Sequence, residues 1–163
     1  MLTLFWDKRG VILKHYIPRG NTVTSTTYAD LLKNHLHPAI KSKRRGRVNT
    51  GVLLQHDNAW PHTAGSTVAT IQVWPLSVLD IRRTRQTSPP SDFHVFGPVK
   101  EAMGGKSFRS DEEVQQAVHE WLGSQPKQLF LEVCSHLRSA AKLVWNAMEI
   151  TQKIKSLCVF CIQ

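Results

Sequence analysis

The first residues of the chain carry two short apolar runs separated by a polar turn. The stretch LTLFWDKRGVILKHYIP, residues 2–18, places Asp7-Lys8-Arg9-Gly10 between those runs. Glycine has no Cβ and suits a turn position with positive φ, so Gly10 fits the end of such a turn. The pattern predicts a β-hairpin.

Apolar residues then recur at helical spacing through STTYADLLKNHLHPAI, residues 25–40. Spacings of three and four residues place them on one face of an α-helix. A hydroxyl side chain at Ser25, Thr26 or Thr27 is suited to the N-cap. The residues expected on the buried face are Tyr28, Leu31, Leu32, Leu36 and Ile40.

Strand and helix patterns alternate along the rest of the chain. Short apolar runs at residues 48–55 and 75–80 predict strands, and residues 62–74 between them predict a helix. Helical patterns follow, with a capping box formed by Ser110 and Glu113. For 163 residues, these elements predict a single α/β domain with a helical C-terminal half.

The balance of charge favours an anionic partner such as nucleic acid. The chain has 21 Lys and Arg against 12 Asp and Glu, a net charge of +9 and a pI near 9.8. The segment KSKRRGR, residues 41–47, is interpreted either as a solvated loop or as a phosphate-binding segment. The candidates for DNA contact are Lys41, Lys43, Arg44, Arg45 and Arg47.

The cysteines and the hydropathy indicate an intracellular protein, nuclear or cytoplasmic, with no membrane partner. Three cysteines make no disulfide framework, and no apolar run approaches the roughly 20 residues of a membrane helix. Cys158 and Cys161 form a C-x-x-C, but there is no second cysteine pair for a zinc site. An apolar tail is the better interpretation of this segment.

Two aspartates occupy positions where ligands often bind. Asp57 follows the predicted strand in QHDNAWPH, Asp92 begins a predicted helix, and 34 residues separate them. Two converging carboxylates can hold Mg²⁺ or Mn²⁺, which prefer oxygen ligands, and a metal pair can support phosphodiester cleavage. The alternative is that each aspartate caps or stabilises the start of a helix.

The motifs HDNAWPH, PPSDFHVFGPVKEAM and FWDKRGVILKHYIPRG together resemble the mariner transposases of the Tc1/mariner group. The resemblance implies an RNase H-like domain for DNA cleavage and integration, with a DNA partner and a possible homodimer. It implies catalytic and metal-ligating roles for Asp57 and Asp92, which match the second and third aspartates of the family triad. The candidates for supporting these ligands are His56, Asn58, His62 and His94, and Trp60 stands where the family usually has arginine.

The chain also departs from the family pattern. The first aspartate of the family lies on a strand upstream of the matched residues, so we expect a partial catalytic domain at residues 1–132 and a divergent helical tail at 133–163. The absent strand is central in the family fold. Its loss should leave two strand edges unpaired, or force the hairpin to pair directly with Val52 to Gln55. Asp7, in the hairpin turn, is rejected as a replacement for the first aspartate.

A second departure from the family pattern lies at residues 81–92. The sequence there is IRRTRQTSPPSD, whereas the family has a segment of the same length like HPPYSPDLAPSD. Two compensating shifts of the reading frame would explain this difference, and the tail is a candidate for the same change. The predicted function is therefore a degraded, inactive transposase fragment with weakened binding of Mg²⁺ or Mn²⁺. The alternative is a non-catalytic, non-specific nucleic-acid-binding remnant or interaction protein.

Overall fold

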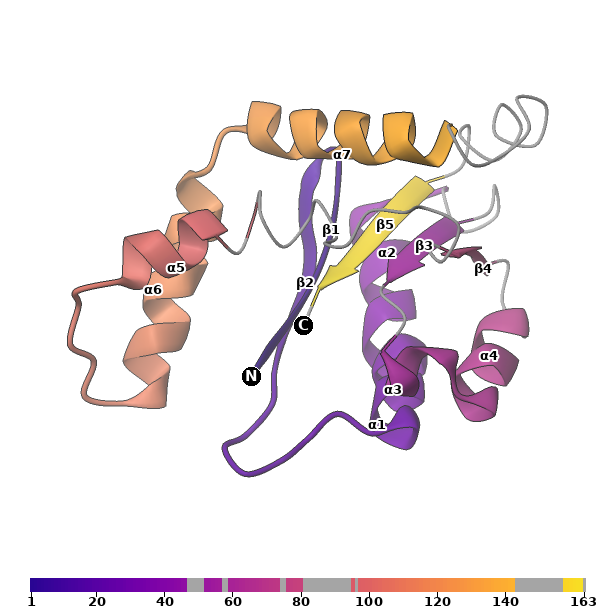
Figure 1. The fold of residues 1–163 in the computed structure, drawn as a ribbon, viewed down its shortest axis with the longest axis horizontal. Helices are drawn as coiled ribbons and strands as arrows, with labels where there is room; N and C mark the ends of the chain where they lie inside the picture. Colours follow the sequence, from indigo (N-terminus) through magenta and orange to yellow (C-terminus); the bar gives the residue numbers. More distant parts are fainter. Residues whose placement is uncertain are drawn as a thin grey trace.

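A five-stranded mixed sheet organises the chain in the computed structural model, which describes residues 1–46, 52–56, 59–73, 76–80, 95, 97–142 and 157–162. The strand order is β2-β1-β5-β3-β4, with helices on both faces of the sheet (Figure 1). The expected α/β class is confirmed. Within the described residues, every helix is too short or too polar to traverse a lipid bilayer.

The N-terminal hairpin forms as predicted. Strands β1 (Leu2–Asp7) and β2 (Gly10–Tyr16) are antiparallel, and their pairing runs from Leu2 opposite Tyr16 to Asp7 opposite Gly10. Gly10 has a φ of 112°, which a residue with a Cβ rarely adopts. A bulge between Phe5 and Trp6 shifts the register and increases the local twist.

The predicted first helix is a continuous helical segment in three parts: α1 (Ser25–Asp30), a π-helical turn η1 (Leu31–Leu36) and α2 (His37–Lys43). Pro38 near the start of α2 has no backbone N–H and cannot complete an α-helical bond there, so the wider turn lies where regular bonding is interrupted. The N-cap is Thr24, one residue before the expected range. Its Oγ1 accepts from the backbone N–H of Thr27 at 3.2 Å.

The middle of the chain forms a parallel strand pair with short helices between the strands. Strand β3 (Val52–His56) pairs with β4 (Leu76–Asp80). Helices α3 (Trp60–Thr63) and α4 (Gly65–Gln72) connect them, in agreement with the predicted order.

Among the residues that the structure describes, three helices follow, which confirms the helical part of the C-terminal half. They are α5 (Gly97–Met103), α6 (Asp111–Ser124) and α7 (Lys127–Lys142). Ser110 caps α6 as predicted, because its Oγ accepts from the backbone N–H of Glu113 at 3.3 Å. The Glu113 carboxylate accepts in return from the backbone N–H of Arg109 at 2.8 Å.

The C-terminal tail is not wholly helical, which corrects the sequence-based expectation. Strand β5 (Leu157–Ile162) lies between the hairpin and β3. It is antiparallel to β1, with Leu4 opposite Ile162, and parallel to β3, with Val52 opposite Leu157. The two edges expected to be unpaired are therefore joined through β5, and the hairpin does not pair directly with β3.

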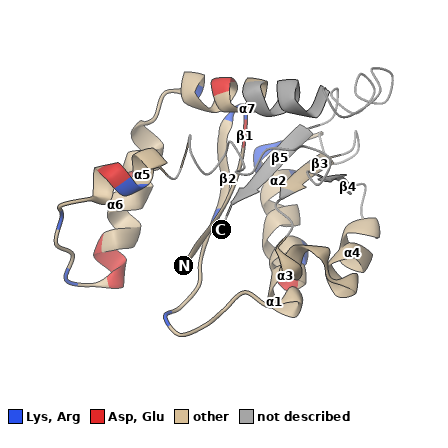
Figure 2. Cartoon of the chain, in the orientation of Figure 1, with Lys and Arg blue, Asp and Glu red and all other residues tan. Residues whose placement is uncertain are grey.

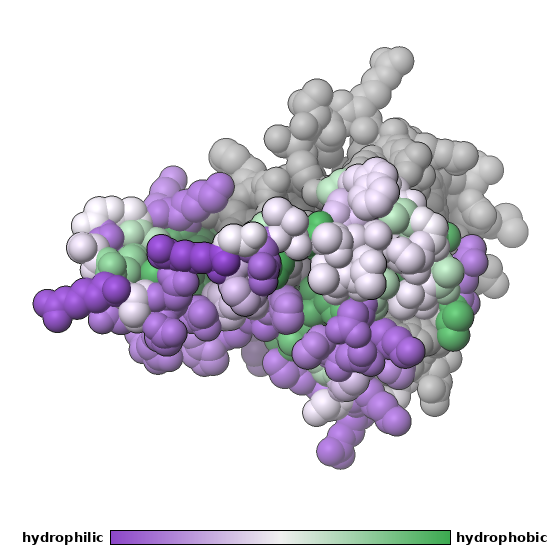
Figure 3. Space-filling view, turned by 90° about the horizontal axis from the view of Figure 1, so that it is seen from below, coloured by the Kyte–Doolittle hydropathy of each residue, from purple (hydrophilic) through white to green (hydrophobic). Residues whose placement is uncertain are grey.

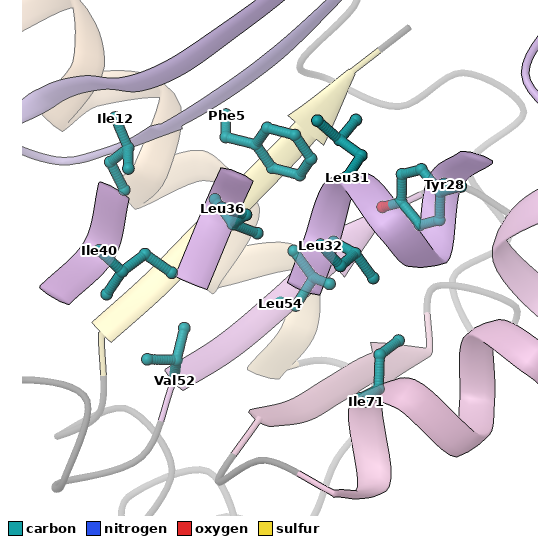
Figure 4. Close-up of a cluster of buried hydrophobic side chains, with 10 residues drawn as sticks. All are labelled: Phe5, Ile12, Tyr28, Leu31, Leu32, Leu36, Ile40, Val52, Leu54 and Ile71. Atoms are coloured by element: carbon teal, nitrogen blue, oxygen red, sulfur yellow. The ribbon is translucent and has the colours of Figure 1, made fainter. Parts of the chain in front are cut away.

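The described side chains form two hydrophobic clusters that flank the sheet. On one face, Leu4 and Trp6 of β1 pack with residues of α5, α6 and α7. On the other face, Phe5, Val52 and Leu54 of the sheet pack with α1, η1, α2 and Ile71 of α4 (Figure 4). All five residues of the predicted helical stripe are buried in this second cluster, which confirms the stripe: Tyr28, Leu31, Leu32, Leu36 and Ile40.

Candidate functional site

The candidate site lies at the edge of the sheet where β3 ends. Because β3, β4 and β5 are parallel, their carboxyl ends meet at this edge, with His56 paired in register with Asp80. Ligands often bind outside the carboxyl ends of parallel strands. In the sequence Asp57 follows His56 directly. The described end of β3 therefore lies at an edge of the sheet that is suited to a ligand.

Several predicted site residues lie outside the described part of the chain: Asp57, Asp92, Asn58, His94 and Arg47. Residues 81–92, whose sequence differs from the family pattern, also lie outside it. Among the residues that the structure does describe, no group of three or more His, Cys, Asp or Glu side chains could hold a metal ion. The metal-ligating roles of Asp57 and Asp92 remain predictions.

Asp80 is an acidic residue that the sequence analysis did not select. It ends β4 and pairs in register with His56, so its backbone lies at the same edge as the candidate site. The signal in the sequence was an aspartate directly after the apolar run PLSVL, the same arrangement that pointed to Asp57.

His62 is placed in the interior by the helices that follow β3. It is 2% exposed, and its ring centroid lies 4.1 Å from that of Tyr28 in α1. The Oγ1 of Thr67 in α4 donates to the carbonyl of Pro61 at 2.6 Å, which ties α3 to α4. These contacts fix the orientation of α3 directly after the candidate site.

Trp60 is the first residue of α3, and it stands where the mariner transposases usually have arginine. It is 72% exposed. Its backbone is held by the helix, since its carbonyl accepts from the N–H of Ala64 at 3.1 Å. This position therefore presents a large aromatic side chain to solvent in place of a cation.

Arg44, one of the predicted DNA-binding candidates, is buried, and its guanidinium is engaged within the domain. It is 8% exposed, and its guanidinium makes two charge-assisted bonds to the Asp7 carboxylate, each 2.8 Å long. The same guanidinium donates to the carbonyl of Gly10 at 3.3 Å. The arginine at the end of α2 therefore anchors the hairpin turn.

The other described basic residues of this segment are exposed. Lys41 and Arg45 face solvent, while Lys43 donates through Nζ to the carbonyl of Ile12 at 2.8 Å. Basic residues also occur in the loop before α6, whose first turn is acidic (Figure 2). The coloured part of the surface in Figure 3 shows hydrophilic side chains beside near-neutral and hydrophobic ones. Lys41 and Arg45 thus remain available for a phosphate partner.

The structure supports the rejection of Asp7 as a substitute metal ligand. Leu4 pairs with Ile162 near the carboxyl end of β5, whereas Asp7 lies beyond Trp6, toward the opposite edge of the sheet. The Asp7 carboxylate is fully buried, and its oxygens accept from Arg44 and from the backbone N–H of Arg9.

The chain is similar to known transposases in sequence and in structure. Residues 1–50 match a family described as "Transposase (partial DDE domain)". The Mariner Mos1 transposase of Drosophila mauritiana is 31% identical over 132 residues, which are 80% of this chain and 38% of that protein. The histone-lysine N-methyltransferase SETMAR of Homo sapiens is 28% identical over 131 residues, which are 80% of this chain and 19% of that protein.

The structural similarity covers a larger share of this chain than the sequence similarity does. A crystal structure of the Mos1 catalytic domain superposes with a TM-score of 0.75 at 28% identity, and the match covers 86% of this chain and 70% of that one. The chain spans less than two fifths of the length of either curated relative. The fold and the sequence similarity together support a mariner-type transposase catalytic domain with an RNase H-like core.

Proposed function

We propose that this chain is a degraded mariner-type transposase domain that no longer cleaves DNA and keeps a non-specific affinity for it. The observation that supports the loss of cleavage is the composition of the central strand. Residues 157–162, LCVFCI, include no aspartate or glutamate. The resemblance assigns the first carboxylate of the triad to the strand at this place in the sheet, next to β3.

Metal binding in this proposal rests on Asp57 and Asp92. Structures of the related Mos1 catalytic domain were determined with Mn and with Mg, which supports divalent ions of this kind as the ancestral cofactors. Two bound metal ions activate a nucleophile and stabilise the leaving oxygen in phosphodiester cleavage. Because β5 carries no carboxylate at the place of the family's first aspartate, we expect these ions to be held weakly.

The proposed partner is DNA. Mos1 has been determined in a paired-end complex with the left transposon end. In this chain, a net charge of +9 and the exposed Lys41 and Arg45 favour contact with phosphates independently of base sequence. We expect binding that weakens steeply with salt, in a nuclear or cytoplasmic protein, and a homodimer only by analogy with the family.

A nicking assay tests the loss of cleavage. Supercoiled plasmid is incubated in Mn²⁺ with the chain and with its Asp57→Ala variant, and a mariner transposase with a complete triad shows that the assay detects activity. We expect neither protein to nick DNA above the buffer control. Circular dichroism of both proteins checks that they are folded. Nicking by the parent chain that disappears in Asp57→Ala would contradict the proposal.

A further inference from the structure

The strand order leaves a central slot in the sheet, defined here as the space between β1 and β3. These two strands do not pair with each other, and each has a hydrogen-bonding edge that faces the slot. In the structure β5 fills the slot, although it comes from the opposite end of the chain (Figure 1).

The direction of β5 in the slot is fixed by its pairing with both neighbouring strands. Leu4, Phe5 and Trp6 pair with Ile162, Cys161 and Phe160 in an antiparallel ladder. Val52 to Gln55 pair with Leu157 to Phe160 in a parallel ladder. A strand that enters the slot in the reverse direction would have to change both hydrogen-bonding patterns.

The packing of the core depends on the slot being filled. Phe5 of β1 and Leu54 of β3 are fully buried in the same hydrophobic cluster, yet they lie on strands two positions apart in the sheet. Adjacent strands lie about 4.8 Å apart, so β1 and β3 are separated by the width of one strand, and that gap must be filled for the sheet under this cluster to be continuous. An empty slot would also leave buried backbone groups of β1 and β3 without partners.

We propose that the central slot is a binding site for one extended apolar strand, and that residues 157–162 of the same chain occupy it as an intramolecular plug. Residues 143–156 join α7 to this strand, and a connector of that length can extend to about 45 Å. Recognition is by main-chain hydrogen bonds, as in strand addition to a sheet. Any other strand, including one that carries a carboxylate, can enter only by displacing the plug.

A disulfide trap tests both the register and the origin of the strand. Leu53 pairs with Cys158 in the parallel ladder, so a Leu53→Cys variant places two cysteines at paired positions on neighbouring strands, a separation that permits a disulfide. Val52→Cys is the matched control, because Val52 pairs with Leu157 and successive strand positions alternate between the two faces of a sheet. Both variants keep the other native cysteines.

After mild oxidation, we expect a disulfide between positions 53 and 158 within monomers of Leu53→Cys, and only background cross-linking in Val52→Cys. Peptide mapping by mass spectrometry identifies the linked residues. A disulfide that joins two chains would show that a second copy supplies the strand, and equal cross-linking of the two variants would show that the register is absent. Either result overturns the proposal.

Hydrogen exchange provides a second measurement. Val159→Pro removes one backbone N–H from the middle of β5, while Gln163→Pro changes a residue just beyond the strand. We expect amide protection in β1 and β3 to fall at least about fivefold in Val159→Pro, because a buried backbone carbonyl loses the N–H of residue 159 as its donor. Protection should stay unchanged in Gln163→Pro. Unchanged protection in Val159→Pro would overturn the proposal. The outcome of this test and of the disulfide trap does not depend on DNA binding or cleavage.

Discussion

Arg44 and Asp7 form a buried, two-bonded ion pair that joins the end of α2 to the hairpin turn. The Nε and Nη2 atoms of Arg44 each lie 2.8 Å from a different oxygen of the Asp7 carboxylate. The Asp7 side chain is 1% exposed and the Arg44 side chain 9% exposed. Asp7 also accepts from the backbone N–H of Arg9, so the carboxylate is satisfied by partners on both sides of the turn.

Removal of either partner of this pair should destabilise the domain strongly. An Asp7→Ala or Arg44→Met variant leaves the other charge buried without its counter-ion, and we expect a loss of about 3–5 kcal/mol in the free energy of unfolding. Urea unfolding followed by circular dichroism measures the change. The exposed neighbour Arg45 provides the control, and Arg45→Met should change the free energy by less than about 0.5 kcal/mol. Equal effects at positions 44 and 45 would contradict the structural role.

The exposed cations of α2 and its C-terminus should contribute to DNA binding. Substitution of Lys41 or Arg45 by alanine should lower affinity for duplex DNA regardless of sequence. Each should also reduce the slope of log affinity against log salt by about 0.9 for every phosphate that the substituted side chain no longer neutralises. Fluorescence anisotropy over a range of salt concentrations provides the measurement.

Arg19 is a suitable comparison for these variants. Its side chain is also exposed, at 86%, but it is paired with Asp111 at 2.8 Å and lies outside the basic segment. Arg19→Ala should leave the salt slope closer to that of the parent chain. If all three alanine variants had the same slope as the parent, the proposed contact through residues 41 and 45 would be wrong.

His15 should make the domain less stable in mild acid. Burial, and then the neighbouring His35, hold the pKa of His15 below its ordinary value of 6.5, while Asp30 opposes them. The ring centroids of the two histidines lie 5.3 Å apart. The unfolded chain therefore binds a proton at a higher pH than the folded domain does. The contribution of His15 to stability is complete above pH 6.5 and is lost as the pH falls from there toward the folded-state pKa.

NMR titration of the His15 ring in the folded protein checks this expectation. The midpoint should lie below the ordinary value of 6.5, and it should move upward in a His35→Gln variant, because the second cause of the shift is removed. A His15→Gln variant should lose less stability than the parent chain between about pH 7.5 and about pH 5. A midpoint at or above 6.5 would show that the ring is not in this environment.

The apolar stripe of η1 should be essential to the core. Leu36 is fully buried in the cluster that joins the helices to β1 and β3 (Figure 4), and Leu36→Ala should destabilise the domain by about 2–5 kcal/mol through reduced burial and a residual cavity. Leu131 of α7 is 43% exposed, so Leu131→Ala should have a much smaller effect. Thermal and urea unfolding measure both, and similar losses of stability at the two positions would contradict the packing.

The sequence by itself determined the elements whose signals are local. The Asp7-Lys8-Arg9-Gly10 turn, the stripe from Tyr28 to Ile40 and the Ser110 cap were all predictable, because each depends on contacts within a few residues along the chain. The motifs around Asp57 and Asp92 indicated the family for a similar reason, since they are short and contiguous. The N-cap was wrong by one residue, because several adjacent hydroxyl side chains can serve equally well.

Only the tertiary structure decided which distant segments meet. Nothing in LCVFCI distinguishes an apolar tail from a central strand, because the choice depends on the free edges of β1 and β3, which lie far earlier in the chain. The same reason explains why the ion pair of Arg44 was not predicted: its charge is visible in the sequence, but the buried carboxylate that neutralises it is 37 residues away. Long-range pairing is set by the complementarity of whole surfaces, and local patterns do not encode it.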